Sequence, residues 1–454
     1  MSKEPIYDPR APVMVPFHSA RPAFMDGIDS PRAYLERCIQ VMEAREGVIK
    51  AFVNINLEGA RRAADAAGQR YKDGRPASVL DGMPLVVKDV IDTEDMPTEY
   101  GSEMFIGRQP EWDAACIYWL RRAGVVITGK TVTAEFATRP AGPTRNPYDL
   151  ERTPGGSSSG SGAAVGAGMA PVGLGTQVRG SVLRPASYCG TYAIKPTYGV
   201  ITLNGILTTS RGINHLGTLA ASLEDAWLTL HWTSRNAGGE ISHTHLPGKT
   251  QMPAPARPDR LIRLETVGWQ STSDEVKAVF EDFLDLLAHE GCEIIGREDD
   301  PEVDRVERMF EDTNEISSAL STWEGRYPML LWGERGAQHL SEMALKGIEE
   351  KEAMDPDAYI HALQRADAMR QAYGPLAGKA DACIALTADG PAPKGMNTGD
   401  VAFCDPFSLL HVPALTLPIF SFDGLPLGLQ LTGFAGNDAR LVVQGAWIRD
   451  FALG

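Results

Sequence analysis

The sequence predicts an α/β fold built as one large domain. Short apolar segments with strand character alternate with longer amphipathic segments through the first half of the chain, a pattern typical of α/β proteins. Apolar strand-like runs return after residue 396, and no turn-rich linker divides the chain. Of the 454 residues, 43% are hydrophobic and 22% are charged, which suits a globular protein with a large core.

The first elements are predicted from capping residues and from the period of the apolar positions. Residues 1–28 are rich in proline and are expected to be irregular. A helix is expected to begin at Asp29-Ser30-Pro31, because proline is favoured at the first helical position. The next segments predict, in order, a strand over 51–55, a helix over 59–74, a strand within 80–93, a helix near 113–123 and a strand over 124–129.

The remaining segments predict a core that carries the candidate site residues, followed by a more variable, helical part of the same domain. Residues 80–231 are expected to form that core, with a small-residue helix and a buried strand after residue 160. Residues 232–395 are more acidic and more helical, and contain an amphipathic helix capped near Thr272 or Ser273. Residues 396–454 hold two apolar runs that predict strands returning to the central sheet.

Charge and cysteine usage exclude several classes of partner. The net charge of −16 and the pI of about 5.1 disfavour binding to nucleic acid or to an anionic membrane. The six cysteines are scattered without a CxxC pair, which indicates reduced thiols in a cytoplasmic protein. The N-terminal residues lack the apolar core of a secretory signal, and no uncharged stretch resembles a membrane span.

Two ligand-like motifs are predicted not to bind ligands. Residues 124–131, GVVITGKT, match the phosphate-loop pattern, but residues 125–128 are β-branched and stiff, as in a strand with Lys130 at its end. His243 and His245 alternate in a polar stretch that offers no third metal ligand. We therefore expect neither a cofactor nor a metal ion.

Two serine-containing stretches can be interpreted either as flexible spacers or as two halves of one site. Residues 153–163 read TPGGSSSGSGA, and residues 175–185 read GTQVRGSVLRP. Glycines before Ser181 would let successive backbone N–H groups point at one spot, as an oxyanion hole requires. A serine nucleophile needs a base, and burial would lower the pKa of Lys88 enough for that role, with Ser157 as a proton relay. The alternatives are a linker and a lysine that reaches water.

Residues 144–199 resemble the amidase signature family over their whole length. Residues 80–93, LDGMPLVVKDVIDT, look like the family's lysine segment, and residues 129–137 like its lead-in to the serines. Residues 424–433, GLPLGLQLTG, resemble its C-terminal strand motif. The resemblance implies a single α/β domain with a mixed, twisted sheet flanked by helices.

The resemblance also implies roles for individual residues. Lys88 would be the general base, Ser157 the bridging serine that follows a cis peptide bond, and Ser181 the nucleophile. Backbone N–H groups around the nucleophile would hold the oxyanion, and further polar residues would support the network or the substrate. The implied oxyanion residues are Val178, Arg179 and Gly180, and the implied supporting residues are Ser158, Thr176, Gln177 and Arg184.

The chain departs from the commoner family text, GTDTGGS, at residues 177–179. Arg179 is the largest departure. It is expected either to narrow the site or to bind a substrate carbonyl or carboxylate through its fork of donors. The alternative is an arginine that points outward or forms a structural pair. Arg184 is expected to pair with Gln177 or with a backbone carbonyl.

The resemblance implies an amidohydrolase for small amides, aryl amides among them, and also for carbamates or esters. The alternative is the A-type component of a glutamine-dependent tRNA amidotransferase, which would need a partner. The expected partner is a small-molecule substrate, and a homo-oligomer is left open.

Overall fold

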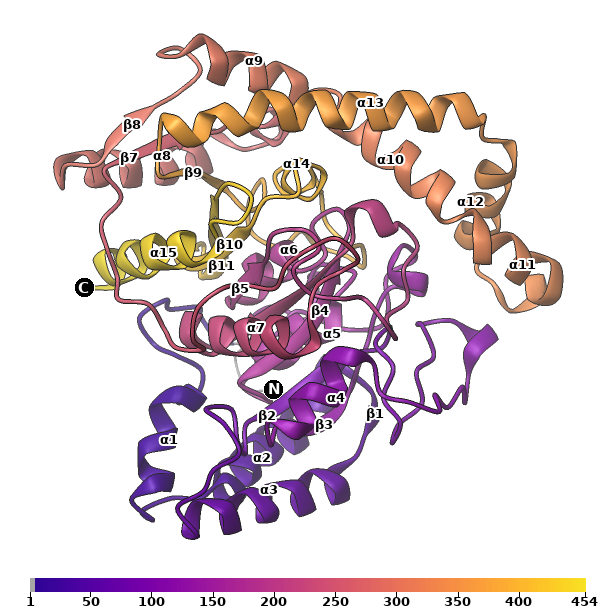
Figure 1. The fold of residues 1–454 in the computed structure, drawn as a ribbon, viewed down its shortest axis with the longest axis vertical. Helices are drawn as coiled ribbons and strands as arrows, with labels where there is room; N and C mark the ends of the chain where they lie inside the picture. The colour runs from indigo at the N-terminus through magenta and orange to yellow at the C-terminus, as the bar shows by residue number, and fades with distance from the viewer. Residues whose placement is uncertain (1–4) are drawn as a thin grey trace.

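One mixed sheet of eleven strands runs through the part of the chain that the computed structural model describes, residues 5–454 (Figure 1). The strand order is β1-β3-β2-β4-β6-β5-β10-β11-β9-β7-β8. Strand β2 pairs in parallel with β3 and β4, strand β7 pairs in parallel with β8 and β9, and the other pairs are antiparallel. The strands are β1 Phe52–Ile55, β2 Pro84–Lys88, β3 Val126–Thr131, β4 Val172–Gln177, β5 Tyr192–Lys195, β6 His215–Ala220, β7 Arg260–Arg263, β8 Glu293–Ile295, β9 Ala382–Leu386, β10 Ala414–Phe422 and β11 Leu425–Thr432.

Fifteen α-helices surround this sheet within the described residues. None of them is both long and apolar enough to cross a membrane. The helices are α1 Phe17–Met25, α2 Pro31–Ile49, α3 Leu57–Lys72, α4 Ala115–Arg122, α5 Ser159–Gly166, α6 Leu183–Cys189, α7 Leu223–Ala237, α8 Asp274–His289, α9 Pro301–Phe310, α10 Thr313–Glu324, α11 Arg326–Gly336, α12 Glu342–Ala353, α13 Pro356–Tyr373, α14 Asp405–Leu409 and α15 Asp438–Leu453.

Helices cover both faces of the sheet, as strand β10 demonstrates. Thr416 donates a hydrogen bond from its hydroxyl to the carbonyl of Leu183 on α6, so this residue faces α6. The neighbouring Leu415 packs beside Gly445 of α15, on the other face, because successive strand residues point to opposite sides. Helix α5 packs against α6 and strand β4, and α7 packs against β5 and β6. Helices α5 and α6 therefore pack together against the sheet, and strand β4 between them in the chain is part of it.

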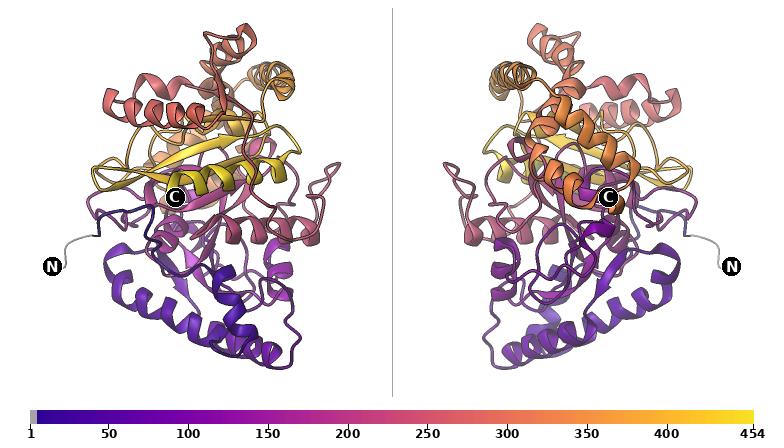
Figure 2. Two further views of the ribbon diagram at one scale, coloured as in Figure 1. Left: turned by 90° about the vertical axis from the view of Figure 1, so that its left-hand side faces the viewer. Right: turned by 90° about the vertical axis from the view of Figure 1, so that its right-hand side faces the viewer.

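The N-terminal helices and the α8–α13 segment lie at opposite ends of the molecule (Figure 2). Helix α13 runs across one end, beside α9 and α10, while α11 and α12 pack together at its far side (Figure 1). This helical segment reaches the middle of the molecule through α10, which packs against the short helix α14.

The predicted α/β class is confirmed, and six strands form where the sequence predicts them: β1, β2, β3, β4, β10 and β11. The expectation that residues 1–28 are irregular is wrong, because α1 forms at Phe17–Met25. The carboxylate of Asp225 accepts hydrogen bonds from the backbone N–H groups of Phe17 and His18 at 2.7 and 2.9 Å, capping a helix that begins after a proline. Such a cap comes from the tertiary fold and leaves no local sequence signal.

Candidate active site

Two parallel strands bring the candidate base to the candidate serine loops. Strand β2 ends at Lys88 and pairs in parallel with β4, which ends at Gln177, so both carboxyl ends meet at one edge of the sheet. The Lys88 ammonium nitrogen donates to Ser157 Oγ at 2.8 Å. It also donates to the Thr176 hydroxyl at 2.9 Å and to the Thr176 carbonyl at 3.4 Å. Lys88 and Ser157 are thus in direct contact, as the sequence predicts.

The electrostatic environment of Lys88 favours the neutral amine. Its side chain is completely buried, and the desolvation that this causes is the main reason why the pKa of Lys88 lies well below its usual value. The charge of nearby Arg184 lowers the pKa further. A neutral amine at the end of a hydrogen bond to a serine hydroxyl is able to accept a proton.

The loop 178–182 connects β4 to α6 and carries Ser181, which is partly exposed. The Gln177 side chain closes this loop, since its Oε1 accepts hydrogen bonds from the backbone N–H groups of Val182 and Leu183 at 3.0 and 3.1 Å. Its amide nitrogen donates to Ser408 Oγ at 3.1 Å. Gln177 therefore fixes the turn around Ser181.

Four consecutive backbone N–H groups in this loop are unused. Among residues 5–454, the N–H groups of Val178, Arg179, Gly180 and Ser181 donate no hydrogen bond. Gly180 has a φ of +117°, which L side chains rarely adopt, and a Cβ there would lie 2.8 Å from the Cβ of Cys404. Gly180 lets the chain turn sharply beside the buried Cys404, just before Ser181, and leaves free donors of the kind that an oxyanion hole needs.

The second serine stretch is held rigidly. The Gly156–Ser157 peptide bond is cis. The Gly156 N–H donates to the carbonyl of Thr398 at 3.1 Å, and the Ser157 carbonyl accepts from the Ala134 N–H at 3.3 Å. The Ser158 N–H donates to the Ser181 carbonyl at 3.3 Å, joining the two serine loops. Residues 153–163 are therefore buried structure rather than a flexible linker.

Arg184 is completely buried and binds backbone carbonyls, one of the two predicted arrangements. Its guanidinium donates to the carbonyls of Thr398 at 2.5 Å, Gly156 at 2.6 Å and Asp400 at 3.0 Å. It makes no hydrogen bond to Gln177 within the described part of the chain. Ser158 joins the Lys88 network indirectly, because its hydroxyl donates to the Thr176 carbonyl at 3.4 Å.

The Arg179 side chain is structurally paired. Its Nε donates to the carboxylate of Asp405 at 2.7 Å, and its terminal nitrogens donate to Asn314 at 2.5 Å and Ser318 at 3.1 Å. Asp405 lies on α14, and the other two partners lie on α10. Arg179 therefore connects the loop that carries Ser181 to helices α10 and α14.

The two rejected motifs have structural roles. Lys130 lies inside strand β3, where its ammonium group donates to the Ile91 carbonyl at 2.6 Å and to the Thr98 hydroxyl at 2.5 Å. The His243 ring packs edge-on against Tyr198. Within residues 5–454, no group of three or more His, Cys, Asp or Glu side chains is placed to hold a metal ion.

A family model described as Amidase matches residues 32–442. The chain belongs to the amidase family. A curated relative, the A subunit of the Glutamyl-tRNA(Gln) amidotransferase from Roseiflexus sp. (strain RS-1), is 31% identical over 463 residues, which cover 94% of this chain and 94% of the relative. A solved structure titled "Crystal structure of amidase" is 26% identical, with a TM-score of 0.85 over 96% of this chain and 100% of the other. The peptide amidase PAM, solved with the competitive inhibitor chymostatin, is 25% identical, with a TM-score of 0.80 over 96% and 97% of the two chains.

This amidase is an enzyme that hydrolyses carbon–nitrogen bonds. Sequence reasoning found the residues on its strand ends and serine loops but missed their supports. Thr398, Asp405 and Ser408 hold the loops from more than 200 residues further along the chain. A structural pair was one of the alternatives expected for Arg179, but nothing in the sequence indicated Asp405 as its partner.

Proposed function

We propose that this amidase is an amidohydrolase that cleaves small amides, aryl amides among them, and carbamates (urethanes) or esters through an acyl-enzyme on Ser181. One observation carries the proposal: the buried Lys88 amine and Ser157 Oγ lie at hydrogen-bond distance, 2.8 Å, beside a loop that presents Ser181 together with unused backbone N–H groups. This arrangement supplies a base, a relay, a nucleophile and an oxyanion site, which acyl transfer requires.

The acylation step follows from these positions. Ser181 Oγ attacks the substrate carbonyl carbon while its proton passes to Ser157 Oγ, and the Ser157 proton passes to the neutral amine of Lys88. The N–H groups of Val178, Arg179 and Gly180 stabilise the negative oxygen of the tetrahedral intermediate. The intermediate then expels the amine or alcohol, which takes a proton from Lys88 through Ser157.

Deacylation repeats the same proton path with water. The relay removes a proton from water as it attacks the acyl carbon, and the bond to Ser181 Oγ breaks as that oxygen regains its proton. Thr176 and Ser158 keep the Lys88 amine oriented through both steps. The Lys88 amine then returns to its neutral form with a free Ser181.

A substrate panel tests the proposal. The purified chain is incubated with an anilide, an aliphatic amide, an aryl carbamate, an ester and glutamine. Ser181→Ala is the inactive control, and Ser19→Ala is the matched control because its hydroxyl contacts only the adjacent His18. Release of aniline or carbamate product that depends on Ser181 but not on Ser19 supports the proposal. Turnover by Ser181→Ala at the wild-type rate would overturn it.

The second candidate is the A-type component of a glutamine-dependent tRNA amidotransferase. It is favoured by the 31% identity, over 94% of both chains, to a relative of that name. This candidate requires glutamine to be the preferred substrate and activity to depend on added partner proteins. Hydrolysis of anilides or carbamates by the isolated chain decides against it.

Cytoplasmic location and a small-molecule partner belong to the same proposal. All six cysteines are free and buried, which suits a reducing compartment. The net charge of −16 disfavours nucleic acid and anionic lipid as partners. Homo-oligomerisation is tested by light scattering on the purified chain.

A further inference from the structure

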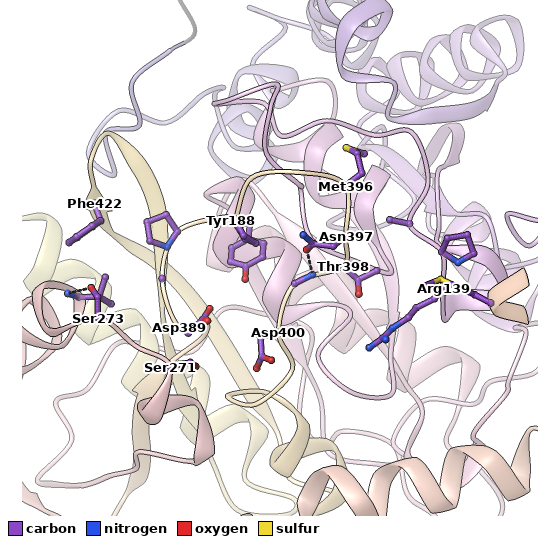
Figure 3. A pocket seen from close by; sticks show the side chains of 18 residues that line it. Arg139, Tyr188, Ser271, Ser273, Asp389, Met396, Asn397, Thr398, Asp400 and Phe422 are labelled. Atoms are coloured by element: carbon purple, nitrogen blue, oxygen red, sulfur yellow. Dashed lines mark hydrogen bonds between the residues drawn. The ribbon is translucent and has the colours of Figure 1, made fainter. Parts of the chain in front are cut away.

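A cavity of about 730 Å³ lies behind the segment that supports the catalytic loops. It is lined mainly by residues 139–141, 271–276 and 389–400, together with Tyr188, Met343 and Phe422 (Figure 3). Lys88, Ser157 and Ser181 do not line it. Thr398 stands between the two sites, because it lines the cavity while its carbonyl accepts hydrogen bonds from Gly156 and Arg184.

Two carboxylates face this cavity without a cationic partner. Asp389 and Asp400 form no ion pair with any described residue, although Asp400 Oδ1 accepts the backbone N–H of Ala402 at 2.7 Å. Figure 3 shows the two side chains at neighbouring places in the cavity wall, where Asp389 is half-buried and Asp400 is exposed. Burial is the main reason why the pKa of Asp389 is raised, and the negative charge of Asp400 raises it further, against a smaller opposing effect of Arg184. A cation between them would relieve both effects.

The third group at this place is an unsatisfied hydroxyl. Tyr188 is completely buried, yet its Oη has no hydrogen-bond partner among the described residues. Buried hydroxyl groups are normally hydrogen-bonded, so an orphan hydroxyl at a cavity wall points to a missing partner. Gly399 keeps the space beside the hydroxyl open, because a Cβ there would lie 3.0 Å from Oη. Figure 3 shows the hydroxyl directed toward the two carboxylates.

We propose that this cavity binds a small aliphatic primary amine, with its ammonium group held between Asp389 and Asp400 and beside the Tyr188 hydroxyl. An ammonium group has three donors, and the two carboxylates and the hydroxyl oxygen are three acceptors. The side chains of Met343, Met396 and Phe422 line the cavity and offer an apolar surface for the alkyl chain. Arg139 also lines the cavity and forms no ion pair within residues 5–454. Because its positive charge repels an ammonium group, the ammonium group binds at the carboxylates and the alkyl chain lies elsewhere in the cavity.

This inference goes beyond the proposed function, because it requires binding and no hydrolysis. Its test therefore uses Ser181→Ala protein, which separates a failure of binding from a failure of catalysis. The probes are n-hexylamine, 1-hexanol and hexanoate, and calorimetry measures their affinity. Hexylamine is expected to bind saturably, and the other two at least tenfold more weakly, since a charge-assisted hydrogen bond contributes about that factor. Equal binding of hexanol, or no saturable binding of hexylamine, overturns the proposal.

Variants of the three acceptors complete the experiment. Asp389→Asn is expected to weaken hexylamine binding about tenfold or more, and Asp400→Asn and Tyr188→Phe to weaken it by smaller factors. Asp259→Asn is the matched control, because the Asp259 side chain is 92% exposed and lies outside the cavity. If Asp389→Asn does not fold, the affinities of Asp400→Asn and Tyr188→Phe for hexylamine test the proposal. Unchanged affinity in both of them, relative to the control, overturns the proposal.

Discussion

Arg179 and Asp405 form a charged pair, with 2.7 Å between Nε and the carboxylate oxygen, only two residues before Ser181. The Arg179 side chain is 23% exposed and that of Asp405 only 2%. The arginine that replaces a family glycine is therefore engaged by the protein itself, through Asp405, Asn314 and Ser318. We therefore expect Arg179 to influence the reaction by holding the loop of residues 178–182 in place, and not by contacting the substrate.

Arg179→Ala is expected to lower the free energy of unfolding by about 3 kcal/mol, because it leaves the buried Asp405 carboxylate without its partner. It is also expected to reduce kcat/KM for all substrates of the panel by similar factors, since the loop that holds Ser181 loosens. Urea denaturation measures the loss of stability, and kcat/KM values for two different substrates of the panel measure the effect on the reaction. Combining the change with Asp405→Asn should restore part of the stability. A changed substrate preference at wild-type stability would show instead that Arg179 binds substrate.

Gln177→Ala is expected to destabilise the protein by about 2–4 kcal/mol, because it strands the buried N–H groups of Val182 and Leu183. Ser408→Ala removes only the acceptor of the Gln177 amide and leaves both contacts of Gln177 to the loop, so a smaller loss is expected. Thermal and urea unfolding of the two variants measure the difference. Equal losses would mean that the bond to Ser408 is the important one.

Gly180→Ala is expected to lower the free energy of unfolding by about 2 kcal/mol or more and to reduce kcat strongly. The alanine Cβ would require the unfavourable φ of +117° and would lie 2.8 Å from the Cys404 Cβ. Gly436→Ala is the control, since that glycine has a φ of +81° but no atom lies within 4 Å of the place that a Cβ would take. A smaller effect at Gly180 than at Gly436 contradicts the expected contact with Cys404.

Lys88→Met is expected to stabilise the protein at pH 7, and this advantage is expected to shrink as the pH rises. The folded state holds Lys88 at a pKa well below normal, whereas the unfolded chain binds its proton up to a pKa of about 10.4. The unfolded wild-type chain thus binds more protons, so wild-type stability rises with pH across this window. Methionine carries no such proton. Urea denaturation of both proteins between pH 7 and 10 gives the difference, and a constant difference would indicate an unshifted Lys88.

The rate of hydrolysis is expected to rise with pH while Lys88 loses its proton and then to become constant. Because burial holds the pKa of Lys88 well below its usual value, the plateau should begin below a pH of about 10.4. The pH profile of kcat/KM with a neutral substrate measures it. A rate that still climbs at pH 10 would mean that the pKa of Lys88 is not lowered, and a profile that stays flat down to a pH of about 5 would count against Lys88 as the base.

Local signals in the sequence predicted most strands and the residues at the strand ends. Lys88 was recognisable because an apolar strand runs directly into it, and Ser181 because glycines flank it. Helix α1 was missed because its cap, Asp225, is about 200 residues away. The sequence offered a backbone carbonyl as a partner of Arg184 and a structural pair for Arg179, but it did not indicate which residues these are, since long-range hydrogen bonds leave no periodic pattern. Strands β7, β8 and β9 were missed inside a segment whose composition is dominated by helices.

The carbonyl of Thr398 accepts hydrogen bonds from both the Gly156 N–H and the Arg184 guanidinium. This contact affects the order in which the site forms during synthesis on the ribosome. Lys88, Ser157 and Ser181 precede Thr398 in the chain, and Thr398 is made more than 200 residues after the last of them. While this intervening segment is being made, the two serine loops lack the carbonyl that joins Gly156 to Arg184. The loops are therefore expected to reach their final arrangement only after residue 398 has left the ribosome.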